Sequence, residues 1–330
     1  MRSSNASSSA GGWEFQSNAA IMLMLKNIEN ASKVKVEGDT EDIEITFSNG
    51  KMLLSQAKAV TNPDDYSNVR KKLEAGLRTL NSAAKLENVE QLVFVTNSPN
   101  PFKQENTMYK FSSPLNIVPF SELPEVCKKI VNEMCIARNY DFDTSLLTVC
   151  VMQFYGEKED ERFKVISNLT TEFLNNLGVS RLSTNQLLTL WQHMFTVNAS
   201  QRATFISKKQ MVWPIIAFHC EVNEDDTALG DYDESDVIEI IQRYRRVINN
   251  NCESFEFISR VLSDYNEFHP EMKSKERSER FISEKWENYE DDFDLKNSDS
   301  DIRKIVICLT VSKVLRSRRI ISSIKGKVNL

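Results

Sequence analysis

Histidine is scarce in this chain: His193, His219 and His269 are the three among 330 residues. Neither His193 nor His219 has a candidate acid or nucleophile close to it in sequence, so a Ser-His-Asp triad and a zinc site are not expected. The six cysteines show no Cys-x-x-Cys pair and no metal-ligand spacing. Most of them lie in apolar runs, so we expect reduced cysteines in a hydrophobic core.

The chain also lacks a long hydrophobic run. The apolar stretch at residues 21–25 is far too short to span a bilayer, and the N-terminus has no apolar segment of the signal-peptide type. These absences predict a cytoplasmic protein that does not associate with membranes. The net charge of −6 does not suggest a nucleic-acid binder. It does not exclude one either, because a local basic face is sufficient.

Residues 33–58 carry the clearest pattern in the sequence. Apolar and polar residues alternate there as they do in half-buried strands. Turn signals at 38–40 and 48–50 separate three runs, and the second turn contains Asn-Gly, a strong hairpin signal. The segment therefore predicts a three-stranded meander that carries the polar residues Glu37, Asp42, Gln56 and Lys58.

The spacing of these polar residues predicts a site on one face of the meander. Gln56 and Lys58 project from the same face of the third strand, because side chains alternate with a period of two. Asp42 opens the middle strand, opposite them. A carboxylate, an amide oxygen and an ammonium group on one face suit Mg²⁺ and an attacking water. The alternative is the solvated face of an antiparallel sheet, which has the same polar pattern without any chemistry.

The order of these residues resembles a known nuclease pattern. Asp42-Ile43-x-Ile45, a glycine turn and Gln56-x-Lys58 resemble the D-QxK variety of the PD-(D/E)xK restriction-endonuclease-like fold. Residues 10–16 and 19–23 are similar to the Gly-x-x-aromatic-Gln opening of one subfamily. Its members are double-strand DNA nucleases, effectors of bacterial anti-phage systems of the CBASS and Lamassu types.

The resemblance implies a Mg²⁺-dependent DNA endonuclease, with Mn²⁺ as the alternative metal. Asp42, Gln56 and Glu37 are then the metal ligands. Lys58 activates the attacking water or steadies the phosphate in the transition state. Gln16 completes the site from the first helix, with Glu14 as the weaker candidate for that position.

The remaining pattern predicts an α/β N-terminal restriction-endonuclease-like core, a central mixed sheet flanked by helices, and a mainly α C-terminal domain. Strands are expected at 91–97, parallel to its partner, and at 115–120 and 146–154. Helices are expected at 13–30, 66–85, 121–138, 157–176, 182–197, 206–216, 234–249, 252–267, 272–289 and 301–325. We predict a flexible leader at 1–11, a nuclease domain at 12–140 and a helical docking or oligomerisation domain at 141–330.

Two side-chain assignments follow from the helices. Trp191 is expected in the core, because aromatic residues dominate core burial. The helix at 66–85 is expected to present a solvated basic face, some of which is open to contact with phosphates. Its basic residues are Arg70, Lys71, Lys72, Arg78 and Lys85.

The resemblance also implies partners. In the Lamassu case the nuclease binds double-stranded DNA, docks on an SMC-like ATPase and an accessory defence subunit, and becomes active on release and self-association as a homo-oligomer. One alternative is a non-catalytic module that binds DNA or a partner on a nuclease-like scaffold. The other is an effector gated by a cyclic oligonucleotide, although its sensor needs a larger αβ region than residues 222–330 supply.

Overall fold

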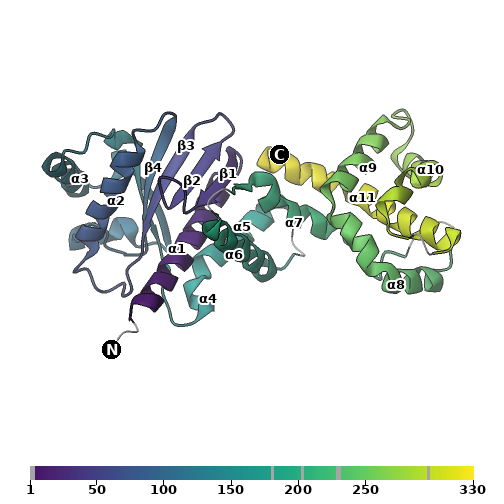
Figure 1. The fold of residues 1–330 in the computed structure, drawn as a ribbon, viewed down its shortest axis with the longest axis horizontal. Coiled ribbons are helices and arrows are strands. Elements are labelled where there is room, and N and C mark those ends of the chain that lie inside the picture. The colour runs from purple at the N-terminus through teal and green to yellow at the C-terminus, as the bar shows by residue number, and fades with distance from the viewer. Residues whose placement is uncertain (1–3, 180–181, 202–203, 228–231, 296–297) are drawn as a thin grey trace. The chain divides into compact units, whose positions relative to one another are not determined.

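The computed structural model describes residues 4–179, 182–201, 204–227, 232–295 and 298–330 (Figure 1). It divides into two compact units, Met1–Met211 and Val212–Leu330. The first unit is built on a seven-stranded mixed sheet, whereas the described part of the second consists of helices without strands. The predicted mixed sheet with flanking helices and the predicted helical C-terminal region are thus confirmed.

The strand order in the sheet is β5-β6-β4-β3-β2-β1-β7. The strands are β1 (Ala31–Val36), β2 (Ile43–Phe47), β3 (Met52–Lys58), β4 (Val89–Thr96), β5 (Leu115–Pro119), β6 (Leu147–Met152) and β7 (Ile206–Ser207). β3, β4 and β6 run parallel to one another, and every other pair is antiparallel. The expected parallel pairing of the strand near 91–97 is confirmed.

The predicted meander forms β1, β2 and β3. Its second turn works as the Asn-Gly signal indicates: Gly50 has a φ of 81° and donates a backbone hydrogen bond of 3.0 Å to Phe47. The register then pairs Ile43 of β2 with Ser55 of β3. One step further along, this register places Asp42 opposite Gln56, at the end of the sheet where β2 begins.

β3 is a central strand, buried on both faces from Leu53 to Ala57. Helix α1 (Ser4–Lys26) packs against β1, β2 and β3, and helix α2 (Val69–Ala83) packs against β3 and β4 on the opposite face (Figure 1). The alternative of a solvated polar face is therefore wrong for Gln56. Helix α2 covers that face and leaves Gln56 only 3% exposed.

The apolar stripes of the helices explain the two layers. On the α2 side, Leu73 and Leu77 pack with Leu54 and Phe94 of the sheet and with helix α3 (Glu125–Arg138) in one buried cluster. On the other side, the α1 residue Phe15 is fully buried. Burial of these side chains supplies the main driving force for assembling the layers.

The N-terminal helix differs from the prediction of 13–30 at both ends. It begins at Ser4, so residues 4–11 of the expected leader are helical, and residues 1–3 lie outside the described part. Two consecutive glycines do not end it, since an interior glycine costs only about 1 kcal/mol relative to alanine. A turn at 27–30 follows, and β1 starts at Ala31.

The first unit also continues beyond the expected boundary at residue 140. Strand β6 lies between β4 and β5, and β7 pairs with β1 at the sheet edge, replacing the first turn of the helix expected at 206–216. The helix expected at 157–176 is divided at Phe163 into α4 (Glu159–Arg162) and α5 (Lys164–Leu177). Helices α5 and α6 (Thr184–Ser200) pack against α1, and Trp191 of α6 is fully buried as expected.

The remaining helices begin with α7 (Lys208–Cys220), which crosses from the first unit into the second. They continue with α8 (Glu234–Glu253), α9 (Phe255–Glu267), α10 (Ser274–Lys285) and α11 (Ser300–Val328). Helices α8, α9 and α10 contact α11. All six cysteines are buried and unbonded, as predicted. Within the described residues, no helix combines the length and apolar character needed to cross a bilayer.

Replacing Gly76 with alanine is expected to destabilise the first unit. A Cβ atom at Gly76 would lie 2.5 Å from ring carbons of Phe94, so α2 or the ring must shift. Overpacking of this kind costs about 1–3 kcal/mol. Gly326→Ala in α11 is the matched control, because open space surrounds that position and alanine favours a helix by up to about 1 kcal/mol. Urea denaturation of both variants checks this, and a Gly76→Ala protein as stable as wild type would contradict it.

Candidate active site

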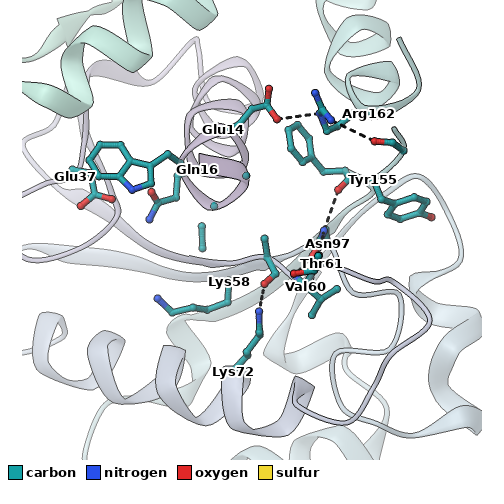
Figure 2. Close-up of a pocket in the computed structure, with 17 residues that line it drawn as sticks. Glu14, Gln16, Glu37, Lys58, Val60, Thr61, Lys72, Asn97, Tyr155 and Arg162 are labelled. Carbon is teal, nitrogen blue, oxygen red and sulfur yellow. Dashed lines mark hydrogen bonds and ion pairs between the residues drawn. The ribbon is translucent and has the colours of Figure 1, made fainter. Parts of the chain in front are cut away.

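A pocket of about 600 Å³ lies where the parallel strands β3 and β4 end (Figure 2). Lys58 ends β3 and Asn97 follows β4, while residues 154–156 follow β6. Residues 11–14 and Gln16 of α1 form the opposite wall. The carboxyl ends of parallel strands meet at one edge of a sheet, where ligands of open α/β sheets commonly bind.

The two residues Thr96 and Asn97 hold this edge together. Thr96 Oγ1 donates to the Lys58 carbonyl oxygen over 2.8 Å. Asn97 Nδ2 donates to the carbonyl oxygens of Val60 and Phe154 at 2.9 and 3.0 Å, and its Oδ1 accepts from Val60 N–H. These bonds join the ends of β3, β4 and β6 to one another, so the backbone that carries Lys58 is held from both neighbouring segments.

Asp42 lies at the open end of the β2–β3 hairpin, where β2 begins and β3 ends, and this place is called the fork between β2 and β3. Its Oδ2 accepts a hydrogen bond of 2.9 Å from the Ala57 backbone and another from Gln56 Nε2. The same oxygen lies 3.8 Å from Lys58 Nζ. The structure thus brings together the three predicted residues Asp42, Gln56 and Lys58. This follows from their positions at one end of paired strands.

The orientation of the Gln56 amide differs from the prediction. Its Nε2 faces Asp42, and its Oε1 accepts a hydrogen bond of 2.5 Å from Thr79 Oγ1 of α2. A carbonyl ligand for a cation beside Asp42 requires the opposite orientation. Rotation of the amide by about 180° exchanges its O and N, and the Thr79 hydroxyl can accept a hydrogen bond as well as donate one. Thr79 can therefore bond the end of the amide that faces it in either orientation, whereas the end that faces Asp42 is hydrogen-bonded only in the observed orientation.

Glu37 and Gln16 form the second part of the site, on the wall opposite Lys58 and Lys72 (Figure 2). Glu37 has a φ of 52°, and its backbone N–H donates to the Asp42 carbonyl over 2.8 Å, so a tight turn places the two acids near each other. Burial and then the Asp42 carboxylate raise the pKa of Glu37. A hydrogen bond from Gln16 and the charge of Lys58 act against that rise.

Glu14, the weaker candidate, has a different partner. Its Oε2 lies 3.0 Å from Nε of Arg162 in α4, and the pair lies along one side of the pocket (Figure 2). Burial raises the pKa of Glu14, and the charge of Arg162 opposes this. Of these two α1 residues, Gln16 is therefore the one that hydrogen-bonds Glu37.

Glu41 is an acid that sequence reasoning missed. It is 4% exposed, and neither of its carboxylate oxygens has a hydrogen-bond partner among the described residues. Burial first, and then the Asp42 carboxylate, raise the pKa of Glu41 to about 8. The adjacent acids Glu41-Asp42 were the available signal. The alternation of side chains in a strand predicts that only one of two adjacent residues, here Asp42, faces the site. The burial of Glu41 depends on tertiary packing.

The donors present fit a cation that keeps part of its water shell. No three His, Cys, Asp or Glu side chains converge on a metal position in the part of the chain that the structure describes. Mg²⁺ is commonly bound by one or two carboxylates together with waters and substrate phosphates. Asp42 and a rotated Gln56 supply one carboxylate and one amide oxygen, and Glu37 is the nearby third candidate.

Of the five basic residues of the helix at 66–85, only Lys72 lines the pocket. Its ammonium group donates to the carbonyl oxygen of Ala59, just beyond Lys58. Arg70 Nε instead donates to the Phe102 carbonyl over 2.6 Å. Lys71 is exposed on the same helix. Of the basic residues predicted on this helix, Lys72 thus belongs to the pocket, whereas Arg70 and Lys71 do not line it.

No protein-family model and no curated protein matches this sequence. Among solved structures, the chain is similar to the Acinetobacter baumannii Cap4 SAVED/CARF-domain containing receptor, at 14% identity and a TM-score of 0.39. The same receptor with the cyclic trinucleotide 3'3'3'-cAAA gives a TM-score of 0.38, also at 14% identity. The Moraxella osloensis receptor gives 15% identity and a TM-score of 0.36. Each alignment covers 63% of this chain and 45%, 46% or 47% of the receptor, so the chain spans less than half of their length.

Proposed function

We propose that this protein is a metal-dependent DNA endonuclease whose site lies at the fork between β2 and β3. The observation that carries the proposal is the contact of Asp42 with both Gln56 and Lys58 beside the pocket. The D-QxK resemblance implies these residues, and double-stranded DNA is the substrate that it implies.

Each residue then has a role that its position supports. Asp42 and Gln56 are the residues that would hold Mg²⁺, which when bound polarises the phosphodiester and lowers the pKa of its water. Lys58 places its ammonium group 3.8 Å from the Asp42 carboxylate, where it stabilises negative charge that develops on the phosphate. Glu37 and Gln16 act as a hydrogen-bonded pair that borders the same space.

A non-catalytic binding module on the same scaffold is the first alternative. Loss of catalysis in such a fold typically removes the lysine or the aspartate, and this chain keeps both. Gln56 is also buried and bonded on both sides of its amide, to Asp42 and to Thr79. Burying this amide is favourable only because both its polar ends are bonded, and that arrangement supports a positioned site.

Plasmid cleavage by the purified chain tests the proposal. With Mg²⁺ or Mn²⁺ present, we expect supercoiled DNA to be converted to nicked and linear forms, and EDTA to stop the reaction. If activation requires self-association, the rate rises more steeply than linearly with protein concentration. No cleavage at any concentration, with DNA binding retained, would support the binding module instead.

An effector gated by a cyclic oligonucleotide is the second alternative. The names of the similar receptors agree with this alternative rather than with the nuclease, and one of those structures contains a cyclic trinucleotide. The same trinucleotide, added to this chain in a calorimetric titration, is the direct test. Binding that also switches on plasmid cleavage would join the two functions. An absence of heat would favour restraint by partner subunits, such as an SMC-like ATPase and an accessory defence subunit.

A further inference from the structure

Lys58 and Lys72 line the same pocket, but the partners of their ammonium groups differ. The ammonium group of Lys58 has Asp42 as its counter-ion, at 3.8 Å. Lys72 makes no ion pair among the described residues, and its ammonium group donates to the Ala59 carbonyl oxygen instead. A half-buried cation is thus held at the pocket by a neutral partner, and no carboxylate of the described residues neutralises it.

The two charges also influence each other. Both side chains line the pocket, and the ammonium group of Lys72 donates to the carbonyl oxygen of Ala59, the residue that follows Lys58. Burial and then the charge of Lys58 lower the pKa of Lys72. Side chains with the same charge repel each other in a partly desolvated place, so this arrangement is costly in the free protein. Binding of an anion between them removes the cost, because each ammonium group then gains a charge-assisted hydrogen bond.

We propose that Lys58 and Lys72 form an anion subsite that binds one phosphate of a polynucleotide backbone. The inference rests on the proposed function, since it takes DNA as the ligand. The ammonium group of Lys72 lies at the carbonyl oxygen of Ala59, the residue after Lys58, and not at Asp42. Lys72 can therefore bind the polynucleotide backbone without contacting the cation ligands. Of the basic residues on α2, Lys72 therefore contributes specifically to binding, and its neighbours do not.

Fluorescence anisotropy with a labelled 20-base-pair duplex in EDTA tests this binding without any cleavage. Lys72→Met removes the charge and keeps the apolar stem, Lys72→Arg keeps the charge, and Lys71→Met is the matched control on the exposed side of α2. We expect Lys72→Met to weaken binding roughly tenfold and to reduce the salt slope, log K against log salt, by about 1. Lys72→Arg restores most of the affinity, and Lys71→Met changes it less than twofold.

The result separates this inference from the nuclease proposal. Equal affinities for Lys72→Met and Lys71→Met, or a wild-type chain that does not bind the duplex, would overturn the subsite. Binding that depends on Lys72 in a chain that never cleaves with Mg²⁺ would retain the subsite and remove the nuclease. Circular dichroism confirms that each variant is folded before its affinity is compared.

Discussion

Replacing Lys58 with alanine is expected to lower the rate of Mg²⁺-dependent DNA cleavage about 10³-fold. The ammonium group lies 3.8 Å from Asp42 and lines the pocket, where it is positioned before the substrate arrives. A preorganised charge aimed at the reacting group contributes about 10²–10³ to the rate. Asp42→Asn is expected to lower cleavage at least as much, and its amide oxygen can still accept from the Ala57 backbone.

The control for this prediction is Lys51→Ala. Lys51 precedes β3 and its side chain is 54% exposed, in an ion pair with Glu90. Its replacement should leave kcat/KM within a factor of two. Initial rates of cleavage of a labelled duplex measure all three variants. A Lys58→Ala enzyme that keeps more than a tenth of the wild-type rate would remove Lys58 from the proposed site, while cleavage by Asp42→Asn would place the cation elsewhere.

The second large effect concerns stability and pH, and it originates in Glu41. The carboxylate is buried without a hydrogen-bond partner among the residues that the structure describes, and its pKa rises from an ordinary value of 4.5 to about 8 in the folded protein. Between these two values the folded chain binds more protons than the unfolded chain. The free energy of unfolding therefore falls as the pH rises through this window, and below and above it Glu41 adds no further pH dependence.

Between pH 5.5 and 8.5 we expect Glu41 to lower the stability of the first unit by on the order of 3 kcal/mol. Glu41→Gln should remove this pH dependence, because the amide has a similar shape and does not ionise. Glu87→Gln, at an exposed position, is the control and should retain it. Hydrogen exchange of peptides from β2 and β3 across a urea series measures this unit by itself. Equal pH slopes for wild type and Glu41→Gln would contradict the assignment.

Glu41 and Gln56 are both buried, but the free-energy cost of burying their polar groups is compensated at Gln56 and not at Glu41. Gln56 is bonded at both ends of its amide, so its burial is compensated. Within the described part of the chain both oxygens of Glu41 lack hydrogen-bond partners, and that burial is compensated only by protonation. Both residues lie close to Asp42, Glu41 in the bend that precedes β2 and Gln56 within β3. The fork between β2 and β3 thus contains a buried amide whose polar ends are both hydrogen-bonded, beside a buried acid whose oxygens are not.

Local patterns in the sequence determined the meander and its register. Alternating side chains and the Asn-Gly turn are enough to pair β2 with β3 and to place Asp42 opposite Gln56, because hairpin geometry depends on neighbours in the chain. The helical periods at 66–85 and 121–138 were equally informative. So was the apolar run at 91–97, whose parallel pairing follows from the helix that precedes it.

The tertiary structure alone decided which of these residues are buried and what they contact. Helix α2 covers the Gln56 face and brings Thr79 and Lys72 to the site from positions 23 and 13 residues away from their partners. The short strand β7 pairs with β1 across more than 170 residues, and no local pattern marks it. The boundary of the first unit at Met211 depends on the same distant packing. Periodicity reports the face of an element, whereas the partner of that face is set by packing between segments far apart in the chain.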